Sequence, residues 1–243
     1  MELSPGTTDR IVTWLSDYAT KAGAGGYVVG LSGGIDSACT AVLCRRALGS
    51  NVLGVLMPCH SSPSDTRLAQ LLADTFGIET VTVALEPAWG AMLGALPDTS
   101  DLARANVKPR LRMTTLYALA QTHGYLVAGT GNKSEIAVGY FTKYGDGGVD
   151  VEPLGELYKT QVRLLAAELE IPQAIIGRPP TAGLWEGQTD EEEMGITYEA
   201  LDTTLAAIEA GDTGHLDPVQ VARVQQMIDG SAHKRSMPPV CPL

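Results

Sequence analysis

Hydrophobic and polar positions along the chain follow two different spacings, which predict helices and buried strands in alternation. From Thr8 to Ala22, apolar residues recur three and four positions apart, as on one face of a helix, and the glycines that follow would end this helix. Short apolar runs bounded by glycine or polar residues predict strands. Strands are expected at Tyr27–Leu31, Asn51–Met57, Glu79–Ala84 and Tyr125–Gly129, and helices at Ser37–Leu48, Ser64–Phe76, within Asp101–Thr122, and at Tyr158–Leu169, Tyr198–Ala210 and Pro218–Gly230.

Strands that alternate with helices indicate βαβ units, so we expect an α/β fold with a doubly wound, Rossmann-like parallel sheet and helices on both faces. No internal repeat and no low-complexity linker divides the chain. We therefore expect a single domain over residues 1–243, with an N-terminal helix in about 1–25 and an extended tail in about 236–243. Residues 86–100 receive no element, and we interpret them as a mobile segment over the site.

A glycine-rich segment stands where the first predicted strand ends and the next helix begins. Its residues are Gly30, Leu31, Ser32, Gly33, Gly34, Ile35, Asp36 and Ser37. Backbone N–H groups, the helix N-terminus and two serine hydroxyls would face a phosphate at this edge of the sheet. Asp36 would repel a phosphate unless a divalent cation lay between them, which suggests Mg²⁺. The segment has neither the Walker lysine nor GxGxxG spacing. The alternative is a glycine turn in which Asp36 caps the helix.

The segment SGGIDS resembles the pyrophosphate loop of the N-type ATP pyrophosphatases, which include NAD, GMP, asparagine and argininosuccinate synthetases. That superfamily cleaves ATP between the α and β phosphates, so that a substrate oxygen is adenylated and pyrophosphate leaves. The resemblance implies an adenine nucleotide alpha-hydrolase-like sheet. The loop alone does not select the substrate.

Several further segments are similar to the ammonia-dependent NAD synthetases, from about residue 10 to residue 235. The matching segments are NVKPRLRM from Asn106, GTGNKSE from Gly129, GYFTKYGDGGVD from Gly139, PLGELYKTQV from Pro153, PTAGLW from Pro180 and GQTDE from Gly187. Residues 132–134 depart from the histidine- and alanine-containing version of many bacterial members, so their contacts are left open. The implied substrates are ATP, deamido-NAD and ammonia.

The resemblance implies a role for individual residues. Asp36 and Glu135 are implied as Mg²⁺ ligands, residues 30–37 with Thr130, Lys159 and Thr181 as ATP contacts, and Arg110, Lys143, Asp150, His233 and Lys234 as contacts of deamido-NAD. Lys159 would offset charge on the leaving pyrophosphate. Asp150 cannot hold an anion, so it would accept a hydrogen bond or deprotonate ammonium.

Each of these residues also has an ordinary interpretation. Glu135 fits a surface glutamate in the first turn of a short helix, and Lys159 a solvated helix residue. Arg110 fits a charge on a helix surface. His233 and Lys234 fit a fragment of a loose tail.

The implied reaction has two steps. The nicotinate carboxylate of deamido-NAD attacks the α-phosphate of ATP, which gives an acyl-adenylate (NAD-adenylate) and pyrophosphate. Ammonia then attacks the activated carbonyl and releases AMP and NAD. The implied ligase reaction needs no protein nucleophile, and the sequence suggests no Ser-His-Asp or Cys-His arrangement.

The charge balance bears on the possible partners. Lys and Arg number 17 against 28 Asp and Glu, and the net charge of −11 argues against general binding to nucleic acid or anionic membranes. Residues 104–178 hold nine basic and seven acidic groups, so the acidity lies in the flanks.

No apolar run suggests a membrane span or signal peptide, and the four cysteines lack CxxC spacing. We expect a cytoplasmic protein with ordinary thiols.

Only 29 residues precede Gly30, too few for the glutaminase domain that some NAD synthetases carry. We therefore expect free ammonia, or ammonia from a separate subunit, as the nitrogen source. The resemblance also implies a homodimer with the substrate site near its interface. Two other functions stay open: the synthetase half of a GMP synthetase, and an ATP sensor without turnover.

Overall fold

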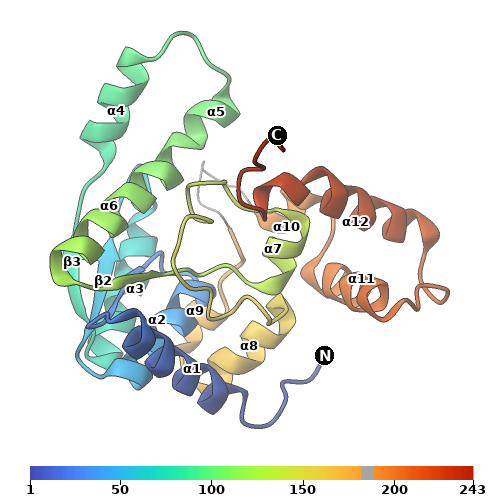
Figure 1. Cartoon of the computed structure of the whole chain (residues 1–243), viewed down its shortest axis with the longest axis horizontal. Helices are drawn as coiled ribbons and strands as arrows, with labels where there is room; N and C mark the ends of the chain where they lie inside the picture. Colours follow the sequence, from blue (N-terminus) through green and yellow to red (C-terminus); the bar gives the residue numbers. More distant parts are fainter. Residues whose placement is uncertain (182–188, 243) are drawn as a thin grey trace.

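The computed structural model describes residues 1–181 and 189–242 (Figure 1). Its described residues contain a parallel four-stranded sheet with the strand order β3–β2–β1–β4. The strands are β1 (Tyr27–Gly30), β2 (Val52–Leu56), β3 (Glu79–Thr82) and β4 (Leu126–Ala128). Beside β4, Ala128 forms a parallel bridge with Val151. The parallel sheet predicted from the sequence is confirmed.

Helices cover both faces of this sheet (Figure 1). On one face α2 packs against β1 and β2, with α1 and α8 outside it, and on the other face α6 packs against β1 and β4 with α4 beside it. The helices are α1 (Thr7–Ala22), α2 (Ile35–Leu48), α3 (Pro63–Phe76), α4 (Glu86–Ala95), α5 (Asp101–Ala105), α6 (Val107–His123), α7 (Lys133–Val138), α8 (Lys159–Glu168), α9 (Gln173–Ile176), α10 (Asp190–Met194), α11 (Tyr198–Ala210), α12 (Pro218–Gly230) and the short 3₁₀ helix η1 (Ala232–Lys234). The doubly wound α/β class is thus confirmed.

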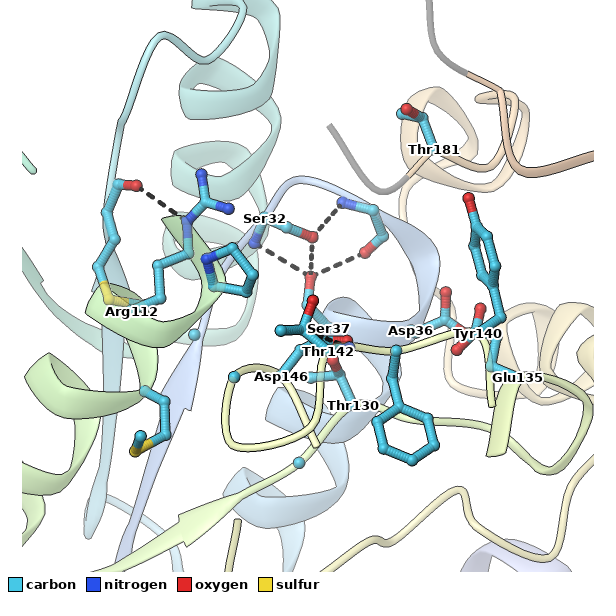
Figure 2. A pocket seen from close by; sticks show the side chains of 18 of the residues that line it. Ser32, Asp36, Ser37, Arg112, Thr130, Glu135, Tyr140, Thr142, Asp146 and Thr181 are labelled. Carbon is cyan, nitrogen blue, oxygen red and sulfur yellow. Dashed lines mark hydrogen bonds between the residues drawn. The ribbon is translucent and has the colours of Figure 1, made fainter. Parts of the chain in front are cut away.

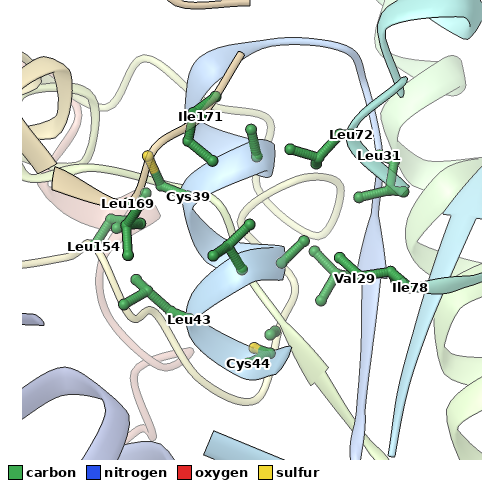
Figure 3. Packing of buried hydrophobic residues seen from close by; sticks show 14 of the residues in the cluster. Val29, Leu31, Cys39, Leu43, Cys44, Leu72, Ile78, Leu154, Leu169 and Ile171 are labelled. Carbon is green, nitrogen blue, oxygen red and sulfur yellow. The ribbon is translucent and has the colours of Figure 1, made fainter. Parts of the chain in front are cut away.

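The main core lies around α2. Figure 3 shows Cys39 and Leu43 of α2 near Leu154 and Leu169, while Val29 of β1 lies on its other side. Because neighbours surround α2, it is apolar around most of its circumference rather than on a single stripe. Burial raises the pKa of the Cys39 thiol. The described cysteines are free thiols, as expected.

Two differences from the predicted elements concern the segment before the fourth strand. The single helix expected within Asp101–Thr122 is divided into α5 and α6 at Asn106. Pro109 has no N–H to donate to residue 105, so the chain loses a helical hydrogen bond at this point. Residues 86–100 contain α4, in which Trp89 donates from Nε1 to the Arg104 carbonyl oxygen (3.3 Å). The segment thus contains a helix where the sequence pattern predicted no element.

The C-terminal part adds a helical layer. α11 and α12 pack on each other and on α7, and they follow the predicted boundaries. Residues 236–242 form no helix or strand and are exposed. Within the described ranges, no helix has the length and apolar character needed to cross a bilayer.

Candidate active site

The loop between β1 and α2 has a conformation that its glycines and serines determine. Gly33 has a φ of 77°, and a Cβ atom there would lie 2.5 Å from the Asp65 carbonyl oxygen, so a larger residue would be strained and would clash. The Ser37 hydroxyl donates to the Gly34 carbonyl oxygen (3.0 Å) and accepts from the Ser32 N–H (3.3 Å; Figure 2). The loop is held in a shape suited to an anion at the N-terminus of α2.

Lys159 joins the two predicted metal ligands. Its Nζ donates to Oδ2 of Asp36 at 2.6 Å and to Oε1 of Glu135 at 3.1 Å, and the residue is only 2% exposed. The ordinary interpretation of Lys159 as a solvated lysine is therefore wrong. Asp36 does not cap α2 either, because the N-cap is Gly34 and forms no side-chain cap bond. The fold brings the first residue of α8 against the first turns of α2 and α7.

Asn132 is a site residue for which the sequence left the contacts open. Its Nδ2 donates to Oδ1 of Asp36 (2.9 Å), and its Oδ1 accepts from the Glu135 N–H (3.0 Å). Oε2 of Glu135 accepts in turn from the Asn132 N–H, which completes a capping box at the start of α7. Glu135 thus does lie in the first turn of a short helix, but its side chain is only 16% exposed. The same asparagine fixes both carboxylates.

A further layer behind Glu135 comes from α10 and α11. The Tyr198 hydroxyl lies 3.0 Å from Oε1 of Glu135 and 3.1 Å from Oδ2 of Asp190, so both carboxylates are within reach of its single donated hydrogen. Tyr140 donates in the same way toward Asp190 (3.1 Å) and Glu193 (2.7 Å). Asp190 belongs to the GQTDE segment. A tyrosine at the start of a helix resembles any core residue, so the sequence holds no signal for Tyr198.

The electrostatics of this centre favour a cation. Burial raises the pKa of Glu135 to about 7; Lys159 opposes this effect, and Asp36 adds to it. Burial also raises the pKa of Asp190. Although burial acts against it, the carboxylates of Asp36 and Glu135 raise the pKa of Lys159 above its usual range. One ammonium among several carboxylates leaves an excess of negative charge.

The oxygen donors of Asp36 and Glu135 suit Mg²⁺. In the described part of the chain, His, Cys, Asp and Glu side chains do not form a cluster of three or more that could hold a metal ion. Water and phosphate oxygens would therefore complete the coordination of Mg²⁺, as is usual for this ion.

A cavity of about 630 Å³ opens over this centre. Almost every predicted site residue lines it: Gly30, Leu31, Ser32, Gly34, Ile35, Asp36, Ser37, Arg110, Thr130, Glu135, Lys143, Lys159, Thr181, His233 and Lys234. The described residues from α4 contribute nothing to its wall. Residues 182–188 of the PTAGLW and GQTDE segments lie outside the described part of the chain.

Two of the basic residues that line the cavity hold the C-terminal segment in place. Lys143 donates from Nζ to the His233 carbonyl oxygen, and Lys234 donates to the carbonyl oxygens of Gly139 (2.8 Å) and Phe141 (2.9 Å). His233 and Lys234 are thus part of η1, docked on the loop after α7, and not of a loose tail. Arg110 is exposed at the cavity edge, as its surface interpretation expects.

Asp150 does not join the cavity in this chain. Its Oδ1 accepts from the Tyr117 hydroxyl (3.0 Å), and its Oδ2 accepts from the Val127 N–H (2.8 Å). These bonds hold the carboxylate at the outer side of β4. The residue is exposed and is not among the residues that line the cavity.

Comparisons with known proteins agree with this site. Residues 7–238 match the family described as NAD synthase. The NH(3)-dependent NAD(+) synthetase of Carboxydothermus hydrogenoformans is 45% identical over 238 residues, which cover 96% of each chain.

Two solved structures are similar along their whole length. NMN synthetase from Francisella tularensis has a TM-score of 0.92 and 37% identity, and the match covers 99% of this chain and 100% of that one. NH3-dependent NAD synthetase from Campylobacter jejuni has a TM-score of 0.85 and 30% identity, with 97% and 98% covered. With its phosphate loop, its paired carboxylates and this similarity, the chain belongs to the NAD synthase family.

Proposed function

We propose that this protein is a ligase that uses ATP and ammonia to convert deamido-NAD to NAD, with release of AMP and pyrophosphate. The observation that carries the proposal is the family match over residues 7–238, together with the Asp36–Lys159–Glu135 centre beside the phosphate loop. A lysine with only a structural role would not need to pair with two carboxylates in the wall of a cavity that ligands can enter. An ATP sensor without turnover would not need this paired centre.

In the first step a carboxylate oxygen of the nicotinate ring bonds to the α-phosphorus of ATP, and the bond from that phosphorus to the bridging oxygen breaks. The N–H groups of the loop and the hydroxyls of Ser32 and Ser37 hold phosphate oxygens. Lys159 lies where negative charge builds up on the leaving pyrophosphate. Mg²⁺, when bound by Asp36 and Glu135, would shield the phosphate charges from these carboxylates. Thr130 and Thr181 line the same cavity and would contact ATP.

In the second step ammonia bonds to the activated carbonyl carbon, loses a proton, and AMP leaves. The basic residues that line the cavity would bind the second anionic nucleotide, deamido-NAD; they are Arg110, Lys143, His233 and Lys234. Asp150 is exposed and does not line this cavity, so we infer that its role in binding deamido-NAD or ammonium requires a site that a second copy completes.

This requirement agrees with a homodimer, which we also propose. The hairpin formed by α4 and α5 exposes Met92 (44%), Leu96 (39%) and Leu102 (58%), and Leu102 also lines the cavity mouth. Large apolar side chains exposed on neighbouring elements are the kind of surface that a protein interface would cover. The substrate site would then lie beside that interface.

The remaining parts of the proposal concern organisation and location. The NH(3)-dependent relative from Carboxydothermus is matched over 96% of its length, which supports a single NAD synthetase domain that uses free ammonia. We propose the cytoplasm as its location, since reducing conditions keep thiols such as those of Cys39 and Cys44 free.

The test is turnover by the purified chain with ATP, Mg²⁺ and deamido-NAD, supplied with either ammonium or glutamine. Ammonium should yield NAD, AMP and pyrophosphate in equal amounts, and glutamine should yield none. Asp36→Ala and Glu135→Ala should each abolish turnover, whereas Asp17→Ala, on the exposed side of α1, should not. Pyrophosphate release that requires XMP instead of deamido-NAD would show a GMP synthetase activity and contradict the proposal.

A second substrate has a specific observation in its favour. The solved structure with a TM-score of 0.92 is described as an NMN synthetase, whose product is a mononucleotide. The same chemistry on nicotinate mononucleotide would give NMN. The ratio of kcat/KM for deamido-NAD to that for nicotinate mononucleotide decides between them, and we expect it to exceed one. A ratio below one would show that nicotinate mononucleotide is the preferred substrate, and the assigned class of reaction would stay the same.

A further inference from the structure

Arg112, on α6, places a partly buried guanidinium in the wall of the cavity. Its Nε donates to the Met57 carbonyl oxygen at 3.4 Å, and its Nη2 donates to Oγ of Ser61 at 3.5 Å. Both contacts are long and both partners are neutral. Among the described residues no carboxylate forms an ion pair with it, whereas in the same wall Lys159 pairs with two carboxylates and Arg178 with one.

This arrangement is costly for the chain in the absence of a ligand. Burial lowers the pKa of Arg112, which means that its surroundings disfavour the charge. Lys108 lies one turn earlier on the same face of α6 and is only 7% exposed, and like charges at this spacing repel. Asp146, Asp65 and Glu86 raise the pKa of Arg112 from a distance, as does Cys59, but among the described residues none of these carboxylates forms an ion pair with it. A bound anion would supply the missing counter-charge.

The position of Arg112 indicates which anion this is. Met57 follows β2, and its Cε lies 3.2 Å from where a Cβ on Gly30 would be, so Arg112 borders the start of the phosphate loop. In Figure 2, Arg112 and the pair Asp36 and Glu135 lie on opposite sides of the loop serines. The leaving pyrophosphate belongs on the side of Asp36, with Lys159 and Mg²⁺. The phosphate that stays attached to adenosine then lies toward Arg112.

We propose that Arg112 binds the α-phosphate of ATP and keeps hold of it in the acyl-adenylate, an inference that rests on the proposed function. As the carboxylate oxygen bonds to the α-phosphorus, the electron pair of the breaking bond leaves with the pyrophosphate, and no proton moves. The guanidinium donates to the non-bridging oxygens of the α-phosphate throughout this exchange. Arg110, two residues earlier, is exposed at the cavity edge and serves the other nucleotide.

A purely structural role for Arg112 makes the opposite prediction for stability. If its purpose were to tie α6 to the end of β2, then Arg112→Gln would lower the melting temperature of the ligand-free protein. If its purpose is to bind an anion, the same change removes an uncompensated charge. The melting temperature should then stay the same or rise.

The experiment measures the binding of AMP, pyrophosphate and deamido-NAD one at a time, by calorimetry, to the full chain with Mg²⁺. Arg112→Gln should weaken AMP binding by about ten- to a hundredfold and pyrophosphate binding by less than about threefold. Arg112→Lys should fall between the two, since lysine keeps the charge without the planar fork. Arg46→Gln, at the other end of α2, is the charge-matched control and should change neither.

Three outcomes would overturn the proposal: an unchanged affinity for AMP, a loss confined to deamido-NAD, or a melting temperature that falls together with all three affinities. Failure of the proposed function gives a different result. In that case the unmodified chain would form no NAD from ATP, deamido-NAD and ammonium, while the effect of Arg112→Gln on AMP binding would persist.

Discussion

At the scale of single residues, the centre of the site depends on one ammonium group. Lys159 is the first residue of α8 and contacts both carboxylates that we assign to Mg²⁺. The residues around Lys159 in the sequence predict only a helix. The resemblance to NAD synthetases implied only that Lys159 contacts ATP. The pairing itself follows from tertiary structure, because Asp36, Glu135 and Lys159 belong to separate helices. Local sequence patterns do not encode such contacts.

Removing this ammonium should make the protein dependent on Mg²⁺ for stability. In EDTA, Lys159→Met should lower the free energy of unfolding by about 3–5 kcal/mol, because it leaves two buried carboxylates without their partner. Added Mg²⁺ should restore part of this loss. Urea denaturation with EDTA or with Mg²⁺ measures both values. Lys21→Met, on the exposed end of α1, is the control, and an equal loss in the two variants would refute the expectation.

A second prediction concerns Glu152, whose Oε2 accepts from the Gly131 N–H (3.1 Å). Burial raises its pKa from 4.5 to about 8. Between these pH values the folded chain keeps a proton that the unfolded chain has released, so the Glu152 contribution to stability falls as the pH rises.

The comparison with Glu152→Gln, which stays neutral, isolates this effect. Relative to that variant, the free energy of unfolding of the parent should decline from pH 5 to pH 8 and then level off. Glu156→Gln is the control, since the Glu156 side chain is 96% exposed. A constant difference between parent and Glu152→Gln would show that Glu152 is ionised throughout.

At the scale of helices, one carboxylate connects three elements. Asp202 of α11 is 1% exposed, and it accepts from the Ser134 hydroxyl of α7 (2.5 Å) and from the Thr160 N–H at the start of α8 (2.9 Å). Ser134 also accepts from the Lys159 N–H (2.9 Å). The helices that carry Glu135 and Lys159 are therefore aligned from behind by α11.

Asp202→Ala should lower the free energy of unfolding by about 2–4 kcal/mol, because it leaves a buried hydroxyl and a helix N–H without an acceptor. It should also weaken Mg²⁺ binding, since α7 and α8 lose their common support. Urea denaturation and a Mg²⁺ titration measure the two effects. Asp212→Ala, whose side chain is 81% exposed, should change neither by much. Weaker Mg²⁺ binding without any loss of stability would contradict this account.

The helices also show where sequence patterns succeed and fail. α11 and α12 have the predicted boundaries, because each begins with a capping residue and has a buried face. α4 was missed because no face of it is buried, and a segment that is apolar around most of its circumference has no stripe to detect. The division between α5 and α6 depends on one proline, and the surrounding pattern is continuous.

At the scale of the whole molecule, α4 and α5 form a hairpin that projects next to α6 (Figure 1), and Leu102 of α5 lines the cavity. We expect sedimentation of the parent to show a dimer. Leu102→Glu should shift it toward the monomer, because a carboxylate would be buried against an apolar surface. Val219→Glu, on the exposed start of α12, should leave the dimer intact. A parent that is monomeric at micromolar concentration would refute the expectation.

The overall architecture could be predicted from the order of strands and helices, and the phosphate loop from its residues alone. The supporting groups could not. Asn132, Arg112 and Tyr198 act through contacts between segments far apart in the chain, and each residue type is common in ordinary structural positions. Asp150 shows the opposite case, since a matching motif assigns it to the substrate while its own hydrogen bonds hold it outside the cavity of this single chain, so its role stays a prediction.

The distribution of the site along the chain has a consequence for how the protein forms. All four strands precede Lys133, whereas the groups that fix the two carboxylates extend to Asp202. As the chain leaves the ribosome, the sheet and the phosphate loop emerge before α8, α10 and α11. Until those helices dock, Asp36 and Glu135 face each other without Lys159, and closing these long loops carries an entropic cost. A nascent chain can therefore hold a finished sheet while it still lacks the centre that makes it an enzyme.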